Sequence, residues 1–431
     1  MKIGLEVHVA LPTKSKLFCA CSTTAEEPNS SICPICLGFP GSKPMLNKAA
    51  LEYSLDVASA LKCVSKPRTS FVRKVYFYPD LPKSYQITQL HDAIGVEGHV
   101  ELEKKRVRIR RIQLEEDPAK IIREDNYTLV DFNRSGLPLL EIVTEPDIAS
   151  EEELREFLNE LRSILYYLGV DIEKELKVDL NISVSDARVE IKNVTGIRNL
   201  VDAARYEIKR QEELVSKKQK IVAETRSYNE KSLKTDASRE KESDEEYGFI
   251  YEPDLTFYRI AEKKREEPII ASKIAEAISR KYGCSKKTLL ELVQFDSKAL
   301  ELLQHAQGKW PIQSIINVIE VLKRYESIKI SNEKFAELLE VAKGGHQITD
   351  QIIKNVTSGA HVKVTVSDVS PQEVDEEIRK MISANPKIVL EHEKNPKALN
   401  FIVGAVAKKL NASPRLVSER LGLFLKKGFK N

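Results

Sequence analysis

The chain has 431 residues, and its 68 Lys and Arg residues nearly balance 65 Asp and Glu residues, giving a formal net charge of +3. This balance excludes binding of nucleic acid through overall charge, so any basic surface must be local. No apolar run approaches the ~18 residues of a membrane span, and no targeting segment is present, which predicts a soluble, cytoplasmic protein without a membrane partner. The length suits two or three domains.

The first predicted element is a β-strand at the N-terminus, with the sequence Ile3-Gly4-Leu5-Glu6-Val7-His8-Val9. Because side chains alternate along a strand, Glu6 and His8 share one face, and the apolar residues between them take the other. A carboxylate and an imidazole side by side form a pair of potential metal ligands.

Two short cysteine pairs follow this strand, Cys19-x-Cys21 and Cys33-x-x-Cys36. Their spacing is typical of a closed, structural zinc site with four thiolate ligands. Two disulfides or free thiols are the alternatives. Disulfides are disfavoured because no signal peptide precedes the pairs, and the remaining cysteines, Cys63 and Cys284, are isolated in the sequence.

The rest of the chain changes from mixed to helical character. Alternating or β-rich patterns predict strands over 70–78, 107–112, 128–132, 177–184 and 187–192, and helical periodicity predicts helices over 48–61 and 151–168. Ser150 and Glu153 form a capping box for the second helix. Charges crowd residues 210–246, which indicates a helix end and then a solvated linker or flap. After Pro268 the pattern is almost entirely helical. The predicted fold class is α+β, with a mixed or antiparallel sheet domain followed by all-helical middle and tail domains.

Acidic residues gather on three of the predicted strands. Glu115, Glu116 and Asp117 end one strand, Asp179 lies on the next, and Glu190 lies on its neighbour. If the last two strands pair as a hairpin, Asp179 and Glu190 share its polar face. Oxygen ligands from several strands suit Mg²⁺ with bound phosphate better than zinc. The alternative is that exposed strand faces carry charges by default.

The C-terminal tail is locally basic. After Glu393 the sequence has many lysines and arginines and only Glu419 against them. This excess fits contact with phosphates, although composition alone favours a solvated lysine-rich tail.

The motifs, taken in order along the chain, resemble the B subunit of the aspartyl/glutamyl-tRNA amidotransferase. The longest match is Arg73-Lys74-Val75-Tyr76-Phe77-Tyr78-Pro79-Asp80-Leu81-Pro82-Lys83-Ser84-Tyr85-Gln86-Ile87. Others are Leu114-Glu115-Glu116-Asp117, Val130-Asp131-Phe132-Asn133-Arg134-Ser135-Gly136, Pro138-Leu139-Leu140-Glu141-Ile142-Val143-Thr144-Glu145-Pro146-Asp147 and Tyr251-Glu252-Pro253-Asp254-Leu255. The resemblance covers the whole length.

The resemblance implies a ligase that works with two partners of the same complex, the amidase (A) subunit, which releases ammonia from glutamine, and the small (C) subunit. Such an enzyme uses ATP and Mg²⁺ to phosphorylate the side-chain carboxylate of Glu-tRNA(Gln), Asp-tRNA(Asn) or both, and the ammonia then displaces the phosphate. The implied domains are a catalytic cradle with the zinc knuckle over 1–265, a helical domain over 266–365 and a tRNA-binding helical tail over 366–431.

The family's functional residues can be carried onto matching positions. The implied magnesium ligands are Glu6, His8, Glu116, Asp179 and Glu190. The implied catalytic residues are Glu116, Lys74 and Lys83, and the two lysines resemble those that line the mouth of the family's ammonia path. Glu115 ranks second, because strand alternation should point its side chain away from that of Glu116. Without the motif, both lysines would be interpreted as solvated. The tail's implied tRNA contacts are Lys408, Lys409 and Arg415.

The chain also departs from the family pattern. Gln113 stands where many relatives have histidine, which puts a supporting role there in doubt, and Pro118 and Ala119 stiffen a loop that usually contains glycine. The metal motif starts only at residue 3, so we expect its strand to lie at a sheet edge or under a partner. Two other functions are alternatives for the chain. One is that of the related archaeal glutamyl-specific E subunit, which carries an extra domain for which this sequence has no room. The other is a non-catalytic, zinc-bearing RNA scaffold.

Overall fold

The computed structural model describes residues 1–170, 176–185, 187–240, 248–260, 271–294, 296–324, 330–343, 348–358, 370–384, 399–410, 412 and 414–426. The chain divides into two compact units, Met1–Ile274 and Ala275–Asn431. The domain boundaries predicted at 265/266 and 365/366 stay predictions.

An eight-stranded sheet forms the centre of the first unit, in the order β13-β12-β11-β10-β1-β9-β6-β5. Its strands are β1 (Lys2–Ala10), β5 (Gly95–Glu101), β6 (Arg106–Glu116), β9 (Pro138–Thr144), β10 (Lys177–Ser183), β11 (Val189–Thr195), β12 (Glu224–Asn229) and β13 (Lys234–Glu240). Neighbours are antiparallel except β11 and β12, which are parallel. The predicted mixed or antiparallel sheet and the α+β class are confirmed.

Strand β1 lies in the middle of this sheet, between β9 and β10. The expectation of an edge strand was wrong. Leu5, Val7 and Val9 are buried on its apolar face, and apolar strands pair readily on both sides where one face is covered by the core.

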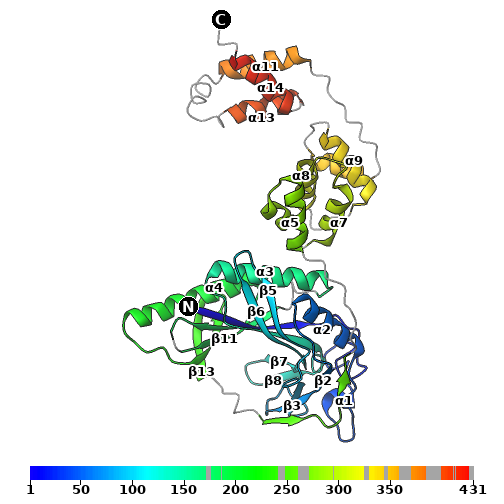
Figure 1. The fold of residues 1–431 in the computed structure, drawn as a ribbon, viewed down its shortest axis with the longest axis vertical. Coiled ribbons are helices and arrows are strands. Elements are labelled where there is room, and N and C mark those ends of the chain that lie inside the picture. Colours follow the sequence, from blue (N-terminus) through cyan, green and yellow to red (C-terminus); the bar gives the residue numbers. More distant parts are fainter. Residues whose placement is uncertain are drawn as a thin grey trace. The chain divides into compact units, whose positions relative to one another are not determined.

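Three helices pack on the apolar face of the sheet: α2 (Lys48–Ala60), α3 (Glu151–Tyr167) and α4 (Ile197–Ser216). Figure 1 shows α3 and α4 running along this face. The N-cap half of the predicted capping box of α3 is confirmed, because the Ser150 hydroxyl accepts from the Glu153 amide at 3.1 Å. The Glu153 carboxylate accepts from the Ala149 amide at 2.8 Å instead of the Ser150 amide. With one face covered by helices, the opposite face of β1, β9 and β10 is left for polar residues.

Smaller β elements lie beside the large sheet. Strands β3 (Val72–Val75), β4 (Tyr85–Thr88) and β14 (Gly248–Tyr251) form a three-stranded sheet. Two pairs complete the unit, namely β2 (Arg68–Thr69) with β15 (Tyr258–Arg259), and β7 (Lys120–Arg123) with β8 (Thr128–Asp131). A short helix, α1 (Pro34–Leu37), follows the first cysteine pair. The strand predicted over 70–78 is therefore shorter, since Tyr76–Tyr78 lie outside it.

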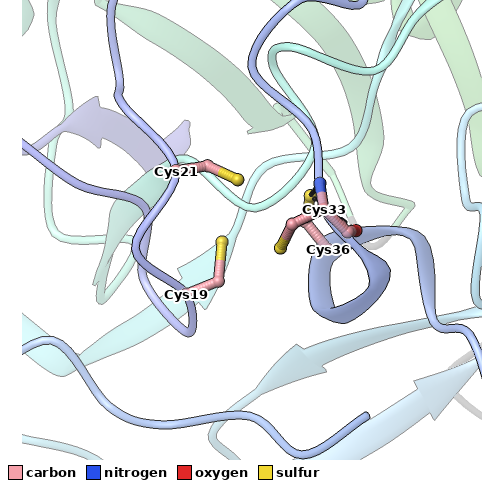
Figure 2. A group of neighbouring side chains, drawn as sticks. All are labelled: Cys19, Cys21, Cys33 and Cys36. Atoms are coloured by element: carbon pink, nitrogen blue, oxygen red, sulfur yellow. Dashed lines mark hydrogen bonds between the residues drawn. The ribbon is translucent and has the colours of Figure 1, made fainter.

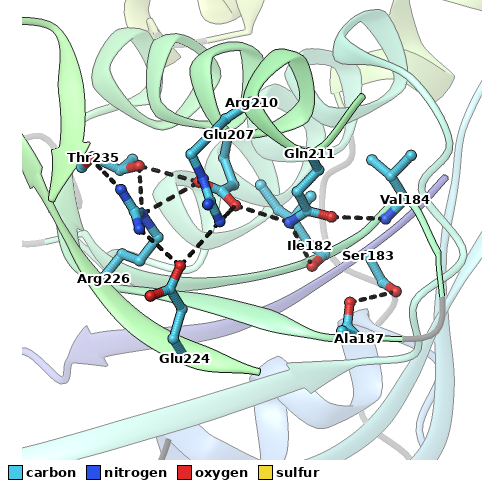
Figure 3. A network of polar contacts seen from close by, with 10 residues as sticks. All are labelled: Ile182, Ser183, Val184, Ala187, Glu207, Arg210, Gln211, Glu224, Arg226 and Thr235. Atoms are coloured by element: carbon cyan, nitrogen blue, oxygen red, sulfur yellow. Dashed lines mark hydrogen bonds and ion pairs between the residues drawn. The ribbon is translucent and has the colours of Figure 1, made fainter. Parts of the chain in front are cut away.

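The charged segment after α4 is not a linker over its described part. It forms the β12–β13 hairpin, which extends the large sheet. The fully buried Glu207 of α4 accepts hydrogen bonds from Arg210 (2.7 Å), Gln211 (2.9 Å) and Thr235 (3.1 Å) and lies 3.4 Å from Arg226 (Figure 3). The charges pair with one another, so the hairpin is ordered despite its low apolar content. Residues 241–246 lie outside the described residues.

The second unit is helical, as predicted. Its helices, with α5 beginning in the first unit, are α5 (Ala271–Tyr282), α6 (Lys286–Val293), α7 (Ser297–Ala306), α8 (Ile312–Leu322), α9 (Asn332–Lys343), α10 (Asp350–Ser358), α11 (Pro371–Ala384), α13 (Leu399–Leu410) and α14 (Pro414–Lys426). The last three share an apolar cluster that includes Val374, Ile402 and Val417. In the described parts of the chain, every helix is too short or too polar to cross a membrane.

Candidate active site

The polar face of the large sheet carries the candidate site. Pairing places Glu6 opposite Asp179 in β10, and His8 opposite Glu141 in β9. Asn181 pairs with Glu190 of β11, so the predicted hairpin is present. Because the apolar residues of these strands face the helices, their carboxylates collect on one surface.

His8 is surrounded by carboxylates. Its Nε2 lies 3.5 Å from Oε1 of Glu115 and 3.9 Å from Oε1 of Glu141. Burial lowers the pKa of His8, but the charges of Glu115, Glu141, Asp179 and Glu6 outweigh burial and raise it above its ordinary value of 6.5. Burial, then the neighbouring Glu115, raises the pKa of Glu141 to about 7. One cation at this place would relieve the repulsion between these groups.

A second acidic group lies next along β1. Oxygen atoms of Glu6, Asp179 and Glu190 all lie within 4.8 Å of one another, an arrangement that could hold a metal ion. The Asn193 amide donates to Asp179 at 2.7 Å, and the Thr225 hydroxyl donates to Glu190 at 3.1 Å. The other oxygens of these two carboxylates lie 3.6 and 3.7 Å from Nζ of Lys192, so a hard cation bound between them would take the place of this ammonium.

Both groups border a large cavity of about 1030 Å³, whose wall includes Glu6, His8, Glu115, Glu141 and Asp179. The same cavity is lined by cationic side chains, which are Lys74, Arg110, Arg111, Arg134, Lys177, Arg188 and Lys192. We call the lining carboxylates the acidic floor and the lining cations the cationic rim of this cavity. Together they suit a ligand that carries phosphates and a divalent metal.

Glu116 lies on the other side of its strand. Its carboxylate accepts from Nζ of Lys83 at 2.5 and 2.6 Å and from the Ile87 amide at 2.8 Å. It lines a second cavity of about 260 Å³, together with Lys83 and Arg73. The structure therefore does not bring Glu116 to the other four predicted magnesium ligands.

The expectation that Glu115 points elsewhere was wrong. In β6, Ile112 and Leu114 are buried in the core, so Gln113 and Glu115 face the polar surface and Glu116 does not. This local alternation was visible in the sequence. The family motif had suggested Glu116 for that surface instead.

The four cysteines of the predicted zinc knuckle meet in space. Their sulfur atoms lie within 4.8 Å of one another, and Figure 2 shows the side chains of both pairs pointing toward a common centre. Cys33 and Cys36 belong to the start of α1, and Cys19 and Cys21 come from the preceding loop. The hydrogen bond from the Cys19 thiol is the main factor that lowers the pKa of Cys36 to about 5. This donor set could hold a zinc ion.

Comparison with known proteins agrees with this geometry. A protein family described as "GatB/GatE catalytic domain" matches residues 1–266. Curated proteins named as the B subunit of an aspartyl/glutamyl-tRNA(Asn/Gln) amidotransferase match nearly the whole chain. The one from Methanoregula boonei is 36% identical over 94% of both chains, and the one from Saccharolobus solfataricus is 36% identical over 98% of this chain and 100% of its own. The one from Persephonella marina is 37% identical over 98% of this chain and 99% of its own.

The chain belongs to this family of amidotransferase B subunits. It is therefore a ligase subunit of a tRNA-dependent amidotransferase that takes part in protein biosynthesis. Membership also favours the multi-subunit enzyme over the RNA scaffold considered as an alternative.

Sequence reasoning missed one residue of this B subunit's site, Glu141, and put a supporting role of Gln113 in doubt. Glu141 stands in the apolar run Leu139–Val143, and it reaches the site because it pairs with His8 across the β1–β9 ladder. Gln113 donates a hydrogen bond from its amide nitrogen to Glu141 and accepts one from Arg111 at 2.9 Å. Gln113 thus links the cation Arg111 to the carboxylate of Glu141.

The two lysines predicted for the ammonia path line different cavities. Lys74 borders the large cavity, and Lys83 borders the small one. In the tail, Lys409 forms an ion pair with Glu377 at 2.6 Å. Lys408 and Arg415 belong to α13 and α14, and their side chains lie outside the described set. A tRNA-binding role for the three stays a prediction.

Proposed function

We propose that this chain, together with a glutaminase (A) subunit and a small (C) subunit, converts Glu-tRNA(Gln), Asp-tRNA(Asn) or both into the amidated aminoacyl-tRNA. In the first step the side-chain carboxylate of the tRNA-bound amino acid attacks the γ-phosphorus of ATP, and ADP leaves. In the second step ammonia attacks the acyl carbon, inorganic phosphate leaves and a proton is released.

The acidic floor of the large cavity carries this proposal. Mg²⁺ bound there would neutralise phosphate charge in the first step. The residues that would hold it are His8, Glu115 and Glu141, or Glu6, Asp179 and Glu190, since each group gathers oxygen or imidazole ligands on one face. Both groups lie on a rigid sheet, which holds ligands in position better than a loop does.

The cationic rim supports binding of triphosphate and tRNA. Arg134 donates to the carbonyls of Pro118 and Ala119 at 2.9 and 2.8 Å and lies 3.4 Å from Asp117, so its guanidinium is oriented before any ligand arrives. Lys74, from β3, lines the same cavity. Oriented cations around a phosphate reduce the reorganisation needed in the transition state.

The small cavity supports a route for ammonia. Strands β3 and β4 separate it from the large one, because Arg73 and Tyr85 face the small cavity while Lys74 and Gln86 face the large one. The Lys83–Glu116 pair lines the small cavity next to that wall, since the Ile87 amide of β4 donates to Glu116 at 2.8 Å. We infer that Lys83 and Glu116 control passage of ammonia.

The basic tail supports contact with the tRNA body through Lys408, Lys409 and Arg415, and the cysteine site supports a structural zinc ion. Release of the Lys409–Glu377 pair would free this lysine for phosphate.

The test is ATP turnover by the assembled complex with each of the two misacylated tRNAs. ADP formation and amide formation should both require a misacylated tRNA, and correctly charged tRNA serves as the control. The Asp179→Asn variant should lose ADP formation, while the partner glutaminase continues to hydrolyse glutamine. ADP release that is independent of tRNA, or amide formation without ATP, would contradict the proposal.

A further inference from the structure

Lys16 is the largest of the fully buried side chains in the described part of the chain, with no exposed surface. Its ammonium donates to the Phe132 carbonyl at 3.2 Å and to the sulfur of Cys36 at 3.7 Å. A buried ammonium is costly unless negative charge lies close to it. The main-chain carbonyl is neutral, so the charge must come from the cysteine side.

The four-cysteine site supplies that charge when a divalent metal is bound, because four thiolates outweigh the charge of one metal ion. Lys16 lies in the loop that follows β1, and its ammonium contacts Cys36, the buried member of the four cysteines. The pairing explains why so large a cation is enclosed here. It also favours a metal-thiolate site over two disulfides, which are neutral.

Two glycines next to the cysteine site lie close to the members of the Lys83–Glu116 pair. Gly38, which caps α1 with φ +71°, is so close to Lys83 that an added Cβ would lie 2.4 Å from Cγ of that lysine. At Gly136, with φ +86°, an added Cβ would lie 3.5 Å from Cδ of Lys16, 3.7 Å from Cβ of Cys36 and 3.9 Å from Oε2 of Glu116. Both positions favour glycine because their φ angles are positive, and at Gly38 an added Cβ would also collide with Lys83.

Main-chain hydrogen bonds connect the loop that holds Lys16 to the end of β6. Phe132 accepts from Lys16, the Leu17 amide donates to the Gly136 carbonyl at 2.8 Å, and the Gly136 amide donates to the Asp117 carbonyl at 2.9 Å. A displacement at the cysteine site would therefore pass through packed backbone to the residue next to Glu116.

We propose that Lys16 is a positioning residue that balances the charge of the metal-bound four-cysteine site, and that this site holds the Lys83–Glu116 pair in place. The proposal does not depend on the proposed catalytic role of that pair.

The first test measures metal affinity in the full chain, with Co²⁺ as the probe. Thiolate-to-cobalt charge-transfer absorption reports binding, in competition with a chelator. Lys16→Met should bind Co²⁺ about 10–100-fold more weakly, the range for loss of a group that supports metal ligands. Lys14→Met, an exposed neighbour, is the matched control and should bind as the wild type does. Equal affinity in the two variants would overturn the proposal.

Should Lys16→Met fail to fold, Lys16→Gln carries the same test, because it retains a donor for the Phe132 carbonyl and removes only the charge. Cobalt affinity equal to that of the wild type would then refute charge balance. Weaker affinity would support it.

The second test uses the Ile87 amide, which donates to Oε1 of Glu116 at 2.8 Å, as a reporter of the pair. Its hydrogen exchange should accelerate about fivefold or more in metal-free protein and in Lys16→Met, the effect of losing one ordinary hydrogen bond. The Val96 amide, which donates to the Val64 carbonyl elsewhere in the unit, should not change. Unaltered exchange at Ile87 would overturn the link between the cysteine site and the pair.

Discussion

Glu115 and Glu116 are adjacent in β6 yet face two different cavities: Glu115 lies 3.5 Å from the imidazole of His8, and Glu116 is bound to Lys83 at 2.5 Å. Strand alternation separates the sheet face that carries the His8 carboxylate group from the side that borders the cysteine site. The two carboxylates are therefore expected to have different roles.

Glu115→Gln should weaken Mg²⁺ binding about tenfold or more, because it removes one charged ligand from the His8 group. Glu116→Gln should leave Mg²⁺ affinity within about twofold, since its carboxylate does not face that group. Titration calorimetry on both variants measures the difference. In the assembled complex, Glu116→Gln should impair amide formation more than ADP formation. Equal loss of Mg²⁺ affinity in the two variants would contradict the separation of roles.

The stability of the metal-free protein should fall as pH rises from about 5 to 8. The folded protein raises the pKa of Glu141 from 4.5 to about 7, so it binds this proton more tightly than the unfolded chain does. The resulting stabilisation is complete below 4.5 and disappears as pH rises through 7. The raised pKa of His8 acts in the same direction.

Added Mg²⁺ should reverse this trend, because the metal competes with those protons. The gain in melting temperature on adding Mg²⁺ should be larger at pH 8 than at pH 6, measured by scanning fluorimetry. Glu141→Gln should flatten the pH dependence of the metal-free protein. The same slope in that variant would show that Glu141 is not the titrating group.

Arg73 and Glu252 join β3 to the segment after β14. The Glu252 carboxylate is fully buried and accepts from Arg73 at 2.7 and 2.9 Å. Arg73→Met should lower the melting temperature strongly, since an unpaired buried charge costs about 3–5 kcal/mol. Arg108→Met is the control. Its partner Asp147 is bound at 2.7 Å, but Arg108 is largely exposed, and solvent screens such pairs, so the melting temperature should change little. Similar losses in both variants would refute the argument.

The sequence predicted most of what depends on local pattern. The alternation around Glu6 and His8, the cap at Ser150 and the cysteine spacing each depend on neighbours in the chain, and the structure has all three. Glu141 could not be found this way, because it reaches His8 only through the β1–β9 register, which is set by the whole sheet.

Strand β12 escaped prediction for a different reason. Its charges, such as Arg226, indicated solvent, whereas in the fold they are neutralised by Glu207 on a helix that precedes it in the chain. The low apolar content of this segment predicted a linker. In the fold, its charges are paired, and paired charges can be buried in a strand.

This buried network should contribute strongly to the first unit's stability. Glu207→Gln keeps the shape of the side chain but removes the charge shared by Arg210 and Arg226, so urea unfolding should show a loss of about 1–3 kcal/mol. Glu212→Gln, exposed on the same helix, should change stability by less than about 0.5 kcal/mol. Because Arg226 of β12 and Thr235 of β13 both contact Glu207, exchange of the β12 amides should also accelerate in Glu207→Gln. Equal stability of the two variants would mean that the hairpin is held by its main-chain ladder and not by the charges of α4.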